Sequence, residues 1–64
     1  MKDLILKKIE ELEEYNQNSR DFCRLLDEND EEDKKIKESE FMQRTRRDYA
    51  IIQLKDILEE MENE

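Results

Sequence analysis

The stretch DENDEED, at residues 27–33, decides the fold of this chain of 64 residues. All of its side chains except Asn29 are acidic. Asp and Asn are weak helix formers, and neighbouring like charges destabilise a helix. Because the sequence contains no Gly and no Pro, this acidic run is the place where we expect the chain to turn. We therefore predict a turn at about residues 28–33 with one helix on each side.

The segment on the N-terminal side, residues 2–28, has apolar side chains at helical spacing. The main stripe carries Ile5, Ile9, Leu12, Cys23 and Leu26. Their steps of three and four residues place them on one face of a helix. The polar residues Asn16 and Ser19 interrupt this stripe at its middle. Either one helix carries a polar layer there, or the helix breaks near residues 16–19.

The segment on the C-terminal side, residues 34–62, is predicted to be one helix with two apolar faces. The first face carries Ile36, Ala50, Ile51, Leu54, Ile57, Leu58 and Met61. The second face, rotated by more than a quarter turn, carries Phe41, Met42, Thr45, Tyr49 and Ile52. A hairpin buries only one face of each helix, so the second face predicts contact with another copy or with a partner protein.

Together these patterns predict an all-α fold, an antiparallel helical hairpin that forms a single domain over residues 1–64. The pairing brings Lys2, Lys7 and Lys8 to the region of Lys55 and Glu59–Glu62. It also brings the acidic residues of the first helix to the region of Arg46, Arg47 and Asp48; these residues are Glu10, Glu11, Glu13 and Glu14. Hydrophobic residues make up 34% of the chain, below the roughly 45–50% of ordinary domains. Because the core is small, we expect the hairpin to form a homo-oligomeric, coiled-coil-like helix bundle, and a four-helix bundle is the simplest form.

The composition excludes several function classes. A net charge of −8 disfavours nucleic acids and anionic membranes as partners. There is no His, and the single Cys can form neither an intrachain disulfide nor a cysteine zinc site. No stretch approaches the roughly 18 apolar residues of a membrane span. We predict no catalytic, cofactor or metal site, and a cytoplasmic location.

A basic cluster is the one local departure from the acidic balance. The candidate anion or partner site comprises Arg44, Arg46, Arg47, Tyr49, Tyr15 and Arg20. One interpretation is a structural polar layer in which the arginines pair with Glu11 or Glu14 and fix the helix register. A second is a pocket that binds phosphate and stacks a base on tyrosine. A third is a hot spot for a protein partner.

The function that these features favour is a non-enzymatic regulator or inhibitor that binds another protein through its helical faces. One alternative is an oligomeric binder of a phosphorylated small molecule or nucleotide, held by the basic cluster. Another is an acidic DNA mimic, with Asp27–Asp33 and Glu10–Glu14 as the mimicking surfaces. Very short acidic helical chains are also typical of phage and mobile-element products.

Overall fold

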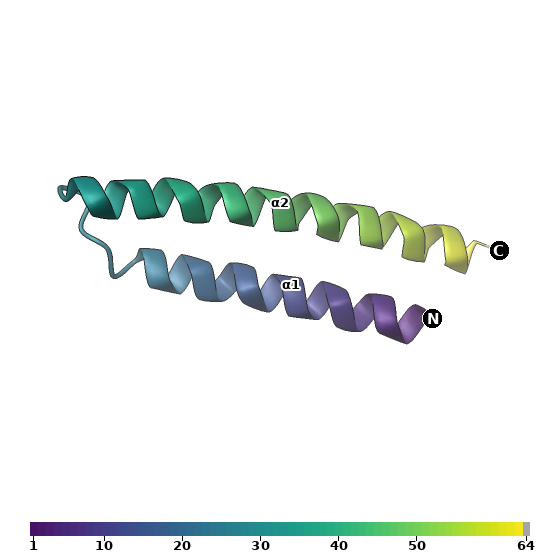
Figure 1. The fold of residues 1–64 in the computed structure, drawn as a ribbon. Coiled ribbons are helices and arrows are strands. Elements are labelled where there is room, and N and C mark those ends of the chain that lie inside the picture. Colours follow the sequence, from purple (N-terminus) through teal and green to yellow (C-terminus); the bar gives the residue numbers. More distant parts are fainter. Residues whose placement is uncertain (64) are drawn as a thin grey trace.

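A computed structural model describes residues 1–63 and confirms the all-α antiparallel hairpin. Its two helices are α1 (Lys2–Cys23) and α2 (Glu31–Glu62), and no strand occurs within residues 1–63. The helices lie side by side in opposite directions, so the start of α1 and the end of α2 lie at the same end of the hairpin (Figure 1). The molecule is a rod of 52 × 14 × 11 Å. Neither helix has the length and apolar character needed to cross a membrane.

Helix α1 is continuous through residues 16–19, so the predicted alternative of a break there is wrong. The helix ends at Cys23, however, and not at residue 28. Beyond Cys23 the backbone tightens, because the amides of Leu25 and Leu26 donate to carbonyls only three residues back. The amide of Asp27 then donates to the Asp33 carboxylate at 2.8 Å. The Asp33 carboxylate thus takes the place of the backbone carbonyl that a continuing helix would offer to this amide, and it directs the chain into the turn.

Helix α2 begins at Glu31, earlier than the predicted residue 34, because Asp30 caps it. The Asp30 carboxylate accepts hydrogen bonds from the amides of Glu32 at 2.8 Å and Asp33 at 3.2 Å. Such a cap satisfies two amides that have no partner within the helix. The acidic residues that follow lie in the first turn, where the helix dipole favours negative charge. Residues 31–33 therefore belong to the helix.

The contact between the helices follows a seven-residue repeat. The least exposed positions of α1 and the residues just after it are Ile5, Ile9, Leu12, Asn16, Ser19, Cys23 and Leu26. The matching positions of α2 are Asp33, Lys37, Glu40, Arg44, Arg47, Ile51, Leu54, Leu58 and Met61, and Ala50 beside Ile51 is also partly buried. Steps alternate between three and four residues, as in coiled coils. We call these two rows the seam.

The seam divides into an apolar half and a polar half. Near the chain ends, Ile9, Ile51 and Leu58 are buried, and they pack against the partly buried Ile5, Leu12 and Leu54. Towards the turn, the seam positions are mainly polar or charged. Two residues predicted on the first apolar face, Ile36 and Ile57, lie beside the seam and are 38% and 45% exposed.

Candidate functional site

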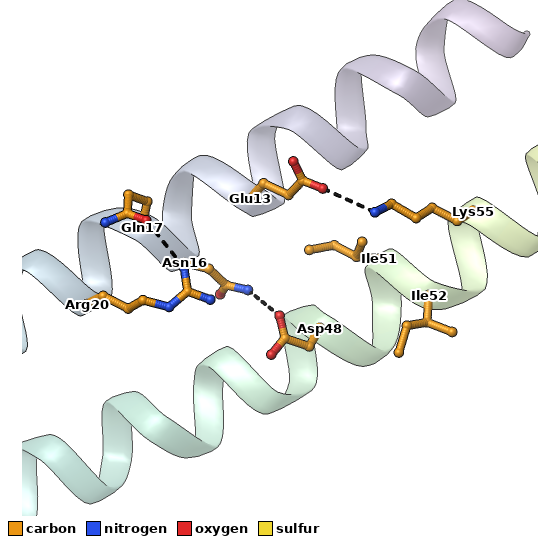
Figure 2. Close-up of a pocket in the computed structure, with 8 residues that line it drawn as sticks. All are labelled: Glu13, Asn16, Gln17, Arg20, Asp48, Ile51, Ile52 and Lys55. Atoms are coloured by element: carbon orange, nitrogen blue, oxygen red, sulfur yellow. Dashed lines mark hydrogen bonds and ion pairs between the residues drawn. The ribbon is translucent and has the colours of Figure 1, made fainter.

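Asn16 is the most deeply buried side chain in the polar half of the seam, with 2% of its surface exposed. Its amide nitrogen donates to the Asp48 carboxylate at 2.8 Å, across the two helices (Figure 2). Its amide oxygen accepts from the Arg47 guanidinium at 3.5 Å. Both ends of the amide are therefore held by α2, as the burial of a polar group requires.

Ser19, which is 5% exposed, makes the next link towards the turn. Its hydroxyl accepts from the Arg44 guanidinium and donates to the Glu40 carboxylate, both at 2.9 Å. The same Arg44 nitrogen lies 3.4 Å from the sulfur of Cys23. Within the described residues, no buried side-chain nitrogen or oxygen atom lacks a hydrogen-bond partner. The seam and the adjoining Asp48 thus form a satisfied polar layer, which we define as Asn16, Ser19, Glu40, Arg44, Arg47 and Asp48.

Two arginines of the predicted basic cluster, Arg44 and Arg47, belong to the polar layer. Arg44 and Arg47 are half-buried in the seam, and the Arg47 guanidinium stacks over the Tyr15 ring at 5.6 Å. The hydrogen bonds of these two arginines do not go to Glu11 or Glu14, the partners proposed above. They go to neutral side chains instead, because the repeat brings Asn16, Ser19 and Cys23 to the facing positions.

The other members of the cluster lie elsewhere. Tyr49 is 64% exposed and Arg46 is also exposed, since both fall outside the seam repeat. Arg20 lies on a different side of the hairpin, where its guanidinium is 3.5 Å from the Gln17 side chain (Figure 2). The six predicted residues are therefore divided between the seam and separate surfaces, and they do not converge on one pocket.

Charged residues line the side of the hairpin drawn in Figure 2. Here the Lys55 ammonium lies 3.5 Å from the Glu13 carboxylate, linking the two helices (Figure 2). At the open end, Lys2 pairs with Glu62 at 2.9 Å, within the acidic region that the antiparallel pairing placed opposite it. Both pairs are exposed to solvent, so each stabilises the hairpin by roughly 0–1 kcal/mol.

The second apolar face of α2 is open to solvent over its whole length. We call it the outer stripe, and it comprises Phe41, Met42, Thr45, Tyr49 and Ile52. Its four large side chains are 57–64% exposed. The Thr45 hydroxyl is turned back to the Phe41 carbonyl at 2.9 Å, which leaves the apolar groups as the main feature of the surface. At about 1.5 Å per residue, the stripe is roughly 17 Å long.

Sequence reasoning did not assign Glu40 and Asp48 to the polar layer. The repeat that places Ile51 and Leu58 in the core, continued towards the turn, also places Lys37, Glu40 and Arg44 in the seam. That spacing was visible in the sequence, but charged residues are not expected in a seam. Asp48 lies beside the seam and joins the layer only through Asn16.

Comparisons with known protein families, with curated proteins and with solved structures found no match for this chain. The residues up to position 63 contain no group of three side chains placed to hold a metal ion. The described residues therefore offer the exposed outer stripe and the polar layer of the seam, beside a surface that carries the exposed ion pair of Glu13 and Lys55.

Proposed function

We propose that this chain is a non-enzymatic regulator that binds another protein through the outer stripe of α2. The observation that carries the proposal is the exposure of Phe41, Met42, Tyr49 and Ile52, at 57–64% each, on one face of a single helix. The hairpin does not use these side chains to fold, because α1 packs against a different face of α2. Aromatic and Met side chains are enriched at the centre of protein interfaces.

The chemistry of the stripe points to an apolar groove on the partner. An amphipathic helix docks into such a groove through side chains three or four residues apart, and the stripe has this spacing. Glu38 and Asp56 lie on the same face beyond the two ends of the stripe, and both are exposed. A groove with basic residues at its ends would match them.

Site-specific photo-crosslinking in the cells that produce the protein tests this proposal. A photoreactive residue replaces Tyr49 in the outer stripe, and a matched variant carries it at Lys7, which is exposed on α1. We expect one partner to be captured from position 49 and not from position 7.

The captured protein is then purified, and its affinity for the chain is measured by calorimetry. Met42→Lys and Tyr49→Lys are expected to weaken binding by about tenfold or more, since central apolar residues dominate interface energetics. Lys7→Ala serves as the control. Equal affinity of all three variants would show that the stripe is not the binding surface.

A further inference from the structure

The two sides of the seam have different chemistry. Residues that directly follow the seam positions Ile5, Leu12, Ser19, Asp33, Glu40, Arg47, Leu54 and Met61 form the charged side. They are Leu6, Glu13, Arg20, Lys34, Phe41, Asp48, Lys55 and Glu62. Residues that directly precede the positions Ile9, Asn16, Cys23, Lys37, Arg44, Ile51 and Leu58 lie on the opposite side. They are Lys8, Tyr15, Phe22, Ile36, Gln43, Ala50 and Ile57. Only Lys8 among them is charged, and we call this row the neutral side.

Side-chain contacts confirm that the two helices contribute to the same sides. Arg47 reaches from the seam to both Tyr15 on α1 and Gln43 on α2, which are members of the neutral side. The ion pair between Glu13 and Lys55 joins the helices on the charged side. Each seven-residue repeat has two core positions. In an antiparallel pair, the residues that precede the same one of these positions in both helices lie on the same side of the seam.

The large residues of the neutral side are only half covered by the hairpin. Tyr15, Phe22, Ile36 and Ile57 are 54%, 46%, 38% and 45% exposed. They come from both helices and occur along most of the rod, so they form a broad face and not a single stripe. This face adjoins the apolar half of the seam, because Ile57 is next to the buried Leu58.

The total solvent-exposed area of the chain indicates how much surface a further contact could cover. A folded monomer of 8.0 kDa exposes about 4,450 Å² according to the scaling of surface with mass. This chain exposes 5392 Å², so the excess is about 900 Å². One partner contributes about 800 Å² to an interface of standard size. The rod shape contributes to this excess, and its size is close to the area that one partner covers in a standard interface.

We propose that a second copy of this chain covers the neutral side, so that two hairpins pack neutral side to neutral side in a four-helix bundle. A two-fold interface must be complementary to itself. The neutral side meets that condition because it is mainly apolar, with Lys8 and the Arg47 guanidinium stacked on Tyr15 as its charged groups. The charged side is less suited to a second copy, since a contact there would remove its carboxylate and ammonium groups from water. The outer stripe is a different surface, so this proposal does not rest on the proposed function.

Sedimentation equilibrium on the whole chain tests the dimer. We expect a mass of twice 8.0 kDa at micromolar concentration. Phe22→Lys and Ile57→Lys are expected to raise the dissociation constant at least tenfold, although lysine reduces the net negative charge. Ile52→Lys, in the outer stripe, is the matched control and should leave the constant unchanged. A monomer at about 100 μM would overturn the proposal.

Crosslinking gives a readout that leaves the large apolar residues of the neutral side in place. In a Cys23→Ser background, Ala50→Cys places a thiol on the neutral side and Ile52→Cys places one on the outer stripe. A bismaleimide that spans facing helices should join two chains through position 50 and not through position 52. The reverse pattern would put the second copy on the outer stripe and overturn the proposal. Loss of partner capture from Tyr49, by contrast, would overturn only the proposed function.

Discussion

At the scale of single residues, Asn16 sets the alignment of the two helices. Its amide is 2% exposed and is held by Asp48 and Arg47. A shift of α2 by one seven-residue repeat in one direction would place Phe41 where Asp48 now lies, and the buried amide would lose its acceptor. An unpaired buried polar group costs about 1–3 kcal/mol. The polar layer therefore stabilises one register over others that an all-apolar seam would allow.

Asn16→Ala should lower the free energy of unfolding by about 1–3 kcal/mol relative to Asn18→Ala. Asn18 is exposed on the same helix, so the change in helix propensity is the same in both variants and cancels in the difference. Urea unfolding followed by circular dichroism measures the effect. Equal midpoints for the two variants would show that the buried amide contributes nothing to stability.

The cap of α2 gives a second prediction at this scale. Asp30→Ala removes the acceptor of two amides and should lower the free energy of unfolding by about 1 kcal/mol. Asn29→Ala is the control in the same turn, because the Asn29 hydrogen bond is made by its backbone amide. If both variants unfold at the same urea concentration, the start of α2 does not depend on the Asp30 carboxylate.

At the scale of the helices, the sequence predicted which segments are helical but misplaced the ends that meet the turn. Spacing of apolar residues predicts a helix reliably because it reflects burial of one face. The ends depend on individual hydrogen bonds, such as those that Asp30 and Asp33 accept from the backbone. Composition alone showed an acidic run, and it did not show which carboxylate caps the helix and which one closes the turn.

The unequal halves of the seam predict where the hairpin opens. The buried apolar residues Ile9, Ile51 and Leu58 lie towards the chain ends, whereas the turn end is joined by polar contacts. Water competes for polar contacts far better than for apolar ones, so local opening should begin at the turn.

Amide hydrogen exchange followed by NMR checks this order. Amides of residues 8–13 and 51–58 should exchange at least about tenfold more slowly than those of residues 19–23 and 33–40. Fraying from the chain ends towards the turn would give the opposite pattern. Equal protection along both helices would mean that the polar layer is as stable as the apolar half.

At the scale of the whole molecule, charge opposes the proposed dimer. Each chain carries a net charge of −8, so two copies repel each other while their neutral sides attract. Raising the salt concentration from about 0.01 M to about 1 M shortens the Debye length from roughly 30 Å to 3 Å. Salt should therefore strengthen the dimer, lowering the dissociation constant by about an order of magnitude. Sedimentation at the two concentrations decides this, and weakening by salt would indicate a contact made by ion pairs.

The candidate surfaces were predictable from the sequence to different degrees. The outer stripe lies where the second apolar face was expected, because Phe41, Met42 and Tyr49 differ in angle from the core residues on α2. The basic cluster did not stay together, since neighbours in sequence point in different directions around a helix. The neutral side was not found, because it combines residues of both helices and appears only when their register is known.

The position of the apolar half, next to both chain ends, determines how the hairpin responds to mechanical force. A tether attached to each end of a single hairpin pulls the helices apart from that end first (Figure 1). The strongest contacts are then loaded before the weak ones, and the load falls on them one pair at a time. The force–extension curve should show an early peak, followed by a long extension at low force as the polar half separates. If force separated the two helices at the turn instead, the polar half would open first and the apolar half last.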